Sequence, residues 1–517
     1  MCSVNCETPS KLTEETVLES KDNDSLSYVE VGHKAAWDSQ TSFILYSERY
    51  SVLFSFCLLT LSSSWQWITW APLNSTRLLC NYWKLSDDGQ GLIDELSAVY
   101  MYIFVPGSFL ALYLLVNHLG LRRGLIVGGV LNTIGSIIRY FGHASYQLVY
   151  IGTIVCAIAQ CFTLSTPPLL AGLWFGSHER GTATAIGVLA NQLGVALGLG
   201  ATIVFDFLDE NSSLEEIDDK NLVLYLRIQM ITAALGLSFV FIFVRSDKPP
   251  TPPSLAAHFQ RENRDNETLK SEYMLSDHQF DIPIIDERTP MLLEAVSNEI
   301  RESIEHLDYV ESIFKAFQDP PTVAFAFVFG LQVGVFYTIP TFLPQIVTQW
   351  SLKEIGWLGL SYQCSGVVGT FLIGKLMDRF QNYKVLMKCL VVISMLSISC
   401  LIITNHFSNL ALSPSWSKAQ NSYQNLLVFI FSGLTGLSLA SLNTIGFEYG
   451  TAISFPSDEA AISGLMECLA ELCGFVLVTF GGQIANVNTL FFIMLGVLFV
   501  SQGILISFPL HPRRPKF

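Results

Sequence analysis

Two glutamates one helical turn apart stand in a long apolar stretch near the end of the chain. Glu467 and Glu471 lie within residues 460–483, a run long enough to cross a bilayer. Because residues i and i+4 share one face of a helix, both carboxyl groups point to the same side. Ionisable groups within a membrane helix face protein or water rather than lipid, and they mark substrate or ion paths. The pair is therefore a candidate for binding a cationic solute or accepting a proton.

The same stretch has a counterpart 280 positions earlier in the chain. Residues 175–179 (FGSHE) match 455–459 (FPSDE), and residues 189–194 (LANQLG) match 469–474 (LAELCG), in one ungapped register. A loop signature and a helix signature that stay in register indicate an internal repeat. Transporters built from two parallel repeats hold the substrate between the halves, near the middle of the membrane. We therefore expect Asn191 and Glu471 to face one cavity from equivalent places.

The composition is that of a membrane protein. Of 517 residues, 50% are hydrophobic and 14% are charged, and the mean hydropathy is +0.43, whereas a soluble domain has about 25% charged residues. The formal charge of −15 comes from residues 1–48, with nine acids and three bases, and residues 246–320, with sixteen acids and seven bases. The remainder has nineteen of each sign. Acidity confined to a tail and a linker argues against nucleic acid as a partner.

Apolar runs of about 20 residues cross a bilayer as helices, and the hydropathy of this chain predicts twelve such spans. The twelve are 50–72, 91–116, 123–142, 147–171, 182–207, 222–244, 322–348, 355–377, 385–404, 425–450, 461–485 and 489–509. The predicted fold class is an all-α polytopic membrane protein with two six-helix halves. The predicted domains are an acidic tail (1–48), a first half (49–245), a linker (246–320), a second half (321–510) and a basic tail (511–517).

Lysine and arginine residues predict the orientation of the spans, because they gather on the cytosolic side. With both termini in the cytosol, the inner side collects thirteen such residues and the outer side seven. The outer seven are Arg77, Lys84, Arg139, Lys220, Arg227, Lys353 and Lys418. Both ends are therefore expected in the cytosol. The sequence leaves the plasma membrane and the endolysosomal membranes open as the location.

The linker between the halves carries two features. Apolar residues between Ile300 and Phe317 fall on one stripe of an acidic segment, which predicts an amphipathic helix under the bundle. Residues 286–293 resemble an acidic dileucine sorting signal, in which Leu292 and Leu293 contact a sorting adaptor. Arg288 stands where an acid is usual, so a plain disordered linker is the alternative reading.

A short loop between spans eight and nine has the residues of a conformational latch. Residues 374–384 read GKLMDRFQNYK and resemble the GxxxDRxxxxK loop of the major facilitator superfamily. Asp378, Arg379 and Lys384 can pair with a neighbouring helix end in one state and release it in another. Basic residues in inner loops are also explained by topology alone, but that explanation does not cover Asp378.

Two further residues are assigned to this latch. Glu448 is predicted near the cytosolic end of span ten, in reach of Asp378. The equivalent loop of the first half keeps Gly120 and Arg122 and has lost the acid. We therefore expect an asymmetric latch.

Aromatic residues lie deep in spans one and seven. Gln66 and Trp67 follow three serines, whereas Trp70 lies near the outer end and suits the membrane interface. Tyr337 follows a stretch of small residues in span seven. The depth of Gln66, Trp67 and Tyr337 predicts that they form part of a cavity wall.

Several short motifs occur in a characteristic order. They are Gln66-Trp67, 120–122 (GLR), 174–176 (WFG) with Glu179, 191–194 (NQLG), 334–337 (GVFY), 446–448 (GFE) and 463–465 (SGL). In these motifs the chain resembles the feline leukaemia virus subgroup C receptor family of transporters, over roughly residues 48–508. Residues 70–72 (WAP) and the proline-rich start of the linker are closer to the disrupted-in-renal-carcinoma type relative.

The resemblance implies the major facilitator fold and cofactor-free transport of a small organic solute. Receptor-type members are associated with choline and ethanolamine and historically with haem, and the renal-carcinoma type is lysosomal and associated with pyridoxine. In the choline-type site a tryptophan and a tyrosine enclose the ammonium group, and these fall on Trp67 and Tyr337. A glutamine of span five falls on Gln192. A desolvated cation–π contact contributes about 2 kcal/mol or more.

The span-eleven acids depart from that pattern, because the relatives have amides at the positions of Glu467 and Glu471. Neighbouring carboxylates in a low-dielectric cavity repel each other, so one of them is expected to hold a proton. The acids therefore indicate either a more strongly cationic substrate or proton coupling.

The prediction from the sequence is a facilitative or secondary active transporter that moves a small organic cation by alternating access. Its expected partners are the solute, the lipid bilayer and protons. The alternatives are a haem or porphyrin carrier, a pyridoxine-type carrier, and a non-transporting receptor or scaffold. The eleven cysteines form no CxxC pair, and we find no nucleophile with a base, so neither a metal site nor a catalytic residue is predicted.

Overall fold

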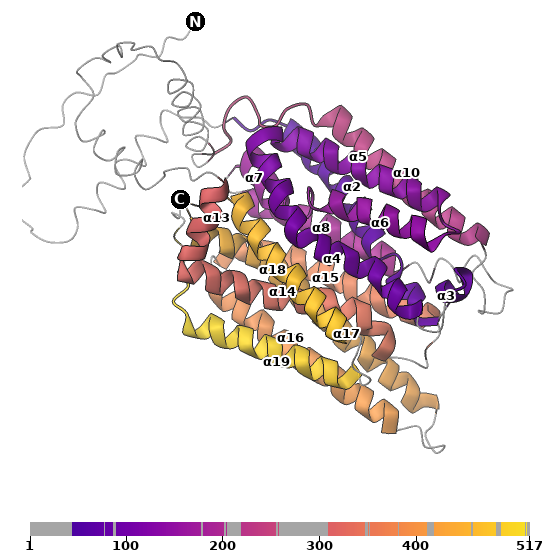
Figure 1. Ribbon diagram of the computed structural model, residues 1–517. Helices are drawn as coiled ribbons and strands as arrows, with labels where there is room; N and C mark the ends of the chain where they lie inside the picture. The colour runs from indigo at the N-terminus through magenta and orange to yellow at the C-terminus, as the bar shows by residue number, and fades with distance from the viewer. Residues whose placement is uncertain are drawn as a thin grey trace, which may run out of the picture. The chain divides into compact units, whose positions relative to one another are not determined.

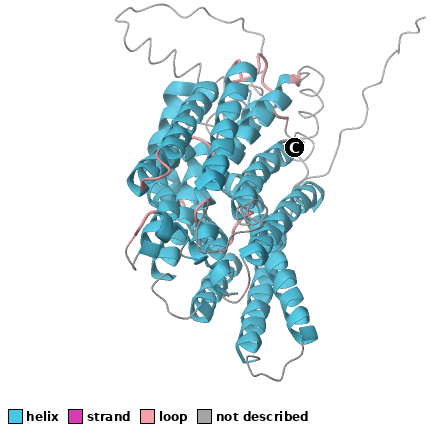
Figure 2. Cartoon of the chain, turned by 90° about the vertical axis from the view of Figure 1, so that its right-hand side faces the viewer, coloured by secondary structure: helices cyan, strands magenta, loops and turns pink. Residues whose placement is uncertain are grey.

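The computed structural model describes the chain in segments. They are residues 44–76, 78–85, 89–176, 179–200, 203, 219–254, 257, 309–346, 350, 352–380, 382–410, 418–455, 457, 459–481, 487–511 and 513. Figure 2 shows helices and no strand in these residues. The predicted all-α class is confirmed.

The helices follow the order of the predicted spans. Up to residue 243 they are α2 (Glu48–Ile68), η1 (Ala71–Thr76), α3 (Leu78–Tyr82), α4 (Gly89–Leu114), η2 (Leu115–Leu119), α5 (Gly120–Phe141), α6 (Tyr146–Gln160), α7 (Pro167–Trp174), α8 (Arg180–Leu199) and α10 (Asp219–Phe243). From residue 309 they are α13 (Tyr309–Gln318), α14 (Pro320–Ile346), α15 (Leu352–Phe380), α16 (Tyr383–Leu410), α17 (Lys418–Ser454), α18 (Glu459–Gly481) and α19 (Val487–Ser507). Each of the twelve predicted spans overlaps one or two of these helices.

Length and hydropathy support a membrane location for this bundle. Among the described residues, nine helical stretches are long and apolar enough to cross a membrane, and one of them, 91–141, contains both α4 and α5. The two remaining predicted spans correspond to α6 with α7 and to α15. Helices α2, α14 and α18 are largely buried, whereas α10 and α19 are largely exposed. The buried helices therefore form the centre, and the exposed ones have surface available for lipid.

The fourth predicted span is not one continuous helix. Helix α6 ends at Gln160, a turn follows, and α7 begins at Pro167. A proline lacks the N–H that a continuing helix needs, and its ring clashes with the preceding turn, so Pro167 and Pro168 start a new helix. The turn is buried in the bundle, where the Ser165 carbonyl accepts a hydrogen bond from Ser463 of α18. The predicted uninterrupted span 147–171 is thus corrected to two segments.

The helices before and after the linker meet along two seams. Helix α4 packs against α18, and α8 packs against α15; Figure 1 shows the earlier helices in indigo to magenta beside the later ones in orange to yellow. Helices α14 and α18 also pack closely, because a Cβ at Gly334 would lie 2.7 Å from that of Cys473. This approach brings Tyr337, one turn along α14, against α18.

Glycine also shapes the turn between α4 and α5. Gly120 has a φ of +74°, a conformation that L side chains rarely adopt. The carboxylate of Asp247, just after α10, fills the space where a Cβ would stand and accepts a hydrogen bond from the Arg122 backbone N–H at 2.7 Å. A carboxylate at a helix N-terminus satisfies free N–H groups and complements the helix dipole. The acid that this loop lacks in sequence is therefore supplied by a distant residue.

Candidate functional site

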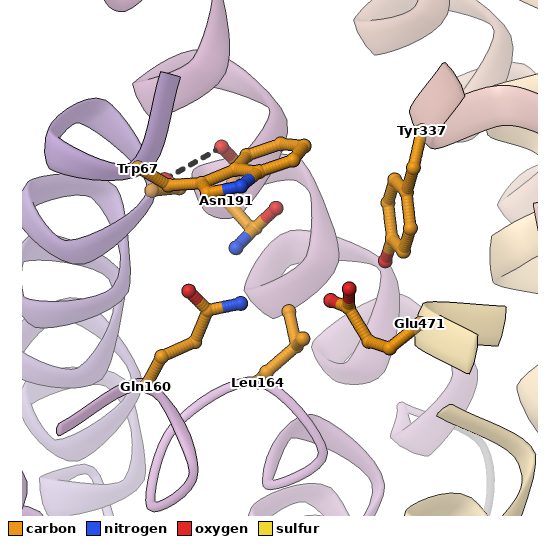
Figure 3. A pocket seen from close by; sticks show the side chains of 7 residues that line it. Trp67, Gln160, Leu164, Asn191, Tyr337 and Glu471 are labelled. Carbon is orange, nitrogen blue, oxygen red and sulfur yellow. Dashed lines mark hydrogen bonds between the residues drawn. The ribbon is translucent and has the colours of Figure 1, made fainter. Parts of the chain in front are cut away.

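A small cavity lies where the two sets of helices meet. Its lining is Ser64 and Trp67 from α2, Gln160 and Leu164 at the break after α6, Asn191 from α8, Tyr337 from α14 and Glu471 from α18 (Figure 3). The cavity measures about 10 Å³, which is near the least space that holds one water molecule. An organic solute can bind here only if the helices move apart.

Two aromatic rings from opposite sides meet at this cavity. The ring centroids of Trp67 and Tyr337 are 5.8 Å apart, and their planes are inclined by 73°. The Trp67 indole N–H donates to the Ser97 carbonyl of α4 at 3.3 Å, which fixes the ring. The aromatic pair proposed from the sequence is thus brought together in space, with the two rings in edge-to-face contact.

The two acids of α18 have different surroundings. The Tyr337 hydroxyl donates to Glu467 Oε1 at 2.5 Å, and Glu467 is fully buried behind it. Glu471 lines the cavity, and Figure 3 shows its carboxylate facing the central space. Oε2 of each acid lacks a hydrogen-bond partner among the described residues. Buried carboxylates without a cation are costly, so Glu471 is the one placed to receive a positive charge.

Two residues predicted to bind substrate do not line the cavity. The Gln66 amide oxygen accepts from Cys156 Sγ at 3.0 Å and from Arg139 at 3.4 Å, on the side of α2 that faces α5 and α6. Gln192 accepts a hydrogen bond from Gln363 of α15 across the seam between the halves. In this conformation both glutamines therefore connect helices and do not line the cavity, and their contact with substrate stays a prediction.

Gln160 is a cavity residue that sequence reasoning missed. Its side chain is buried, its amide oxygen has no hydrogen-bond partner in the described part of the chain, and Figure 3 shows the amide directed into the cavity. The available signal was an amide in the interior of an apolar span, followed within eight residues by two prolines. Treating the span as one helix concealed that signal.

The predicted latch residues that the structure describes lie on several helices. Arg379 lies at the end of α15, is exposed, and has its guanidinium carbon 5.7 Å from the Phe380 ring centroid. The Lys384 ammonium donates to the Phe508 carbonyl at 2.8 Å, next to the end of α19. Glu448 is buried on α17. The Asp378 side chain lies outside the described ones, so its pairing in the latch stays a prediction.

We expect Asp378→Asn to slow transport far more than it weakens substrate binding. A latch acts on the equilibrium between conformations, and the solute contacts are elsewhere. Uptake kinetics and equilibrium binding on the same protein preparation separate the two effects. Parallel losses in affinity and turnover would count against a latch.

An ion pair joins the halves at the end of the bundle where α8 and α18 begin. Arg180 of α8 pairs with Glu459 of α18, and both side chains are mostly buried. In the same region Arg49 pairs with Glu179 at 3.2 Å, and Ser463 donates to the Ser165 carbonyl at 3.2 Å. Sequence reasoning placed Glu459 in the repeat and Arg180 in an inner loop without pairing them. The pair stabilises contact between the halves on this side.

We expect Glu459→Gln to favour opening on this side, because the change removes a mostly buried ion pair between the halves, and breaking such a pair costs about 3–5 kcal/mol. Thiol labelling of a cysteine placed at Ser165 should become faster in the variant. The charge-exchanged protein, Arg180→Glu with Glu459→Arg, should restore slow labelling. Equal labelling rates in all three proteins would show that the ion pair does not keep this side of the bundle closed.

Comparison with known proteins identifies the fold family. The model of the Major Facilitator Superfamily matches residues 52–450. The chain belongs to the major facilitator superfamily. Its fold is also similar to a partially occluded inward-open structure of the xylose transporter XylE from E. coli, with a TM-score of 0.60 and 13% identity over 91% of this chain and 100% of that one.

This superfamily member has curated relatives in the predicted receptor family. It is 26% identical to choline/ethanolamine transporter flvcr2b of Danio rerio over 86% of this chain and 79% of that protein. It is 25% identical to choline/ethanolamine transporter FLVCR2 of Homo sapiens over 85% of this chain and 72% of that protein. The resemblance expected from the motifs is confirmed, and the protein is an integral membrane transporter of a small-molecule substrate.

Other predictions are not tested by the described residues. Leu292 and Leu293, proposed to bind a sorting adaptor, lie outside them. The orientation of the termini, the identity of the membrane and the domain limits stay predictions. Within the described residues, no group of three His, Cys, Asp or Glu side chains is placed to hold a metal ion.

Proposed function

We propose that the protein carries a small organic cation of the choline or ethanolamine type across its membrane by alternating access. The observation that supports this most is the meeting of Trp67, Tyr337 and Glu471, from opposite halves, at one cavity. The chemistry of these groups selects a positively charged solute with an apolar surface.

Each lining group contributes a distinct part of that selectivity. The faces of Trp67 and Tyr337 attract a cation, and a desolvated contact of this kind contributes about 2 kcal/mol or more. The Glu471 carboxylate supplies a full negative charge. The amides of Gln160 and Asn191 can donate to or accept from a hydroxyl or amine group. An ammonium group joined to a short polar chain suits this set.

The choline/ethanolamine transporters named above support the same substrate class, as relatives of about one-quarter identity. Among the described residues, the cavity lining has no lysine, arginine, histidine or cysteine, which disfavours a haem or porphyrin anion. Pyridoxine and a non-transporting receptor role remain as alternative outcomes of the tests.

The acids suggest how protons enter the cycle. Glu471 faces the cavity, so a proton and an organic cation compete for the same carboxylate. Glu467 does not line the cavity, because Tyr337 lies between them. The hydrogen bond from the Tyr337 hydroxyl to Glu467 keeps the tyrosine ring oriented. We propose that the proton is exchanged at Glu471 and that Glu467 has a supporting role.

Contacts on both sides of the cavity support transport by alternating access. Towards the start of α8 the halves are joined by Arg180 and Glu459. Towards its end, Gly359 of α15 packs against Leu199, and Tyr102 of α4 contacts Phe475 of α18 with ring centroids 6.0 Å apart. Opening one set while keeping the other gives the solute a path to one side at a time.

Ligand-induced stabilisation of the purified protein tests the substrate class. A ligand that binds only the folded state raises the melting temperature by mass action. We expect choline or ethanolamine to raise it in the wild type and not in Trp67→Ala, with pyridoxine, haem and spermidine as comparison ligands. Stabilisation by haem or pyridoxine alone would replace the proposed substrate.

A further inference from the structure

Arg139 is a buried cation beside the candidate site. It lies in the last turn of α5, which the topology predicted from Lys and Arg placed on the outer side, yet only 1% of its surface is exposed. The guanidinium carbon is 5.0 Å from the Trp70 ring centroid. Its Nη1 donates to the Gln66 backbone carbonyl at 3.1 Å and to the Gln66 amide oxygen at 3.4 Å. Arg139 therefore contacts the residue directly before Trp67.

No carboxylate balances this charge within the described part of the chain. The ion pairs found there involve Arg49, Arg180, Arg513 and His143. Among the residues that the structure describes, the Nε and Nη2 groups of Arg139 also lack hydrogen-bond partners. Burying an uncompensated charge is unfavourable, so its retention calls for another electrostatic partner.

The C-terminus of α2 supplies that partner. Helix α2 ends at Ile68, inside the predicted span, so its last four carbonyls have no donor from the helix itself. Within the membrane such carbonyls must be satisfied by other protein groups. The helix dipole also places partial negative charge at this end, where a cation is favoured. Arg139 meets both needs at the Gln66 carbonyl.

We infer that Arg139 is a positioning residue for Trp67 in the substrate cavity. By capping the interrupted end of α2, it fixes the backbone from which the indole ring reaches Ser97 and Tyr337. The inference rests on the proposed function in taking Trp67 as a substrate contact. It makes affinity for the organic cation depend on a residue that does not line the cavity.

Three variants of the full-length protein test this inference. Arg139→Met keeps the length of the side chain and removes both donor and charge, Arg139→Gln keeps a neutral donor, and Arg139→Lys keeps charge and donor. The control is Arg227→Met, since Arg227 is exposed and its guanidinium carbon lies 5.9 Å from the Tyr140 ring centroid. Choline affinity is measured on purified protein, and Trp67 is observed by ¹⁹F NMR after labelling with 5-fluorotryptophan. The Trp67 signal is assigned by its loss in Trp67→Phe.

The Met variant should bind choline about tenfold or more weakly, as expected for a lost hydrogen bond to a charged group. Its Trp67 signal should shift. Arg139→Lys should keep the wild-type choline affinity and Trp67 signal, and the control Arg227→Met should change neither of them. If the Met variant does not fold, the Gln variant should show a smaller change of the same kind. A folded Met or Gln variant with an unmoved Trp67 signal and wild-type affinity overturns the inference, even if its melting temperature falls. A wild type that binds no organic cation overturns the proposed function instead, and the ¹⁹F shift alone then decides the role of Arg139.

Discussion

Trp67→Ala and Tyr337→Ala should each abolish saturable uptake of a cationic solute while the protein still reaches the membrane. The two rings come from opposite halves and lie 5.8 Å apart at the cavity. Losing one cation–π contact removes about 2 kcal/mol, which weakens binding roughly thirtyfold. Radiolabelled choline uptake over a concentration series measures the loss.

Conservative and neighbouring variants give this test its controls. Trp67→Phe keeps an aromatic face and should retain partial uptake. Trp65→Ala changes the same residue type on the same helix, but Trp65 donates to the Tyr225 hydroxyl at 2.8 Å and does not line the cavity. It should therefore transport with near wild-type affinity. Normal uptake by both alanine variants at the cavity would mean that the aromatic pair serves packing only.

Glu471→Gln should weaken cation binding and remove its dependence on pH. In the wild type, a proton on Glu471 neutralises the charge that attracts the solute, so affinity should fall as pH is lowered. The glutamine keeps the shape and hydrogen bonding of the protonated acid but cannot titrate. Its affinity should be about tenfold or more below the high-pH wild-type value, and equal to the value that the wild type approaches at low pH. Equilibrium binding of choline across pH provides the comparison.

Glu467→Gln is the matched control for this experiment, one helical turn away on the same face. Its amide oxygen can still accept from the Tyr337 hydroxyl, so the pH response should survive. If the control loses the response and Glu471→Gln keeps it, the proton belongs to Glu467. If neither variant nor the double variant alters affinity or pH response, the acids have a structural role.

The helices were predictable because the bilayer imposes length and hydropathy on every span. The repeat and the depth of aromatic residues also predicted that Trp67, Asn191, Tyr337 and Glu471 approach one another. These predictions depend on one-dimensional periodicity and on symmetry, which a sequence displays directly.

The remaining features depend on how helices end and pair. Gln160 reaches the cavity because Pro167 and Pro168 interrupt the fourth span. The sequence does not predict the contact of Arg139, because its partner is a backbone carbonyl at the end of α2, and a backbone partner leaves no charged residue to recognise in the sequence. Asp247 takes the place of the missing acid at the start of α5 from more than a hundred residues away.

The most direct test of the account is choline or ethanolamine exchange in vesicles that contain only this purified protein. Vesicles loaded with unlabelled choline should accumulate labelled choline or ethanolamine in a saturable manner, faster than protein-free vesicles, and Trp67→Ala should remove the difference. An opposing pH gradient should change the rate in the wild type and have no effect in Glu471→Gln. Labelled choline and ethanolamine that enter no faster than in protein-free vesicles, under any gradient, would contradict transport of this class of cation.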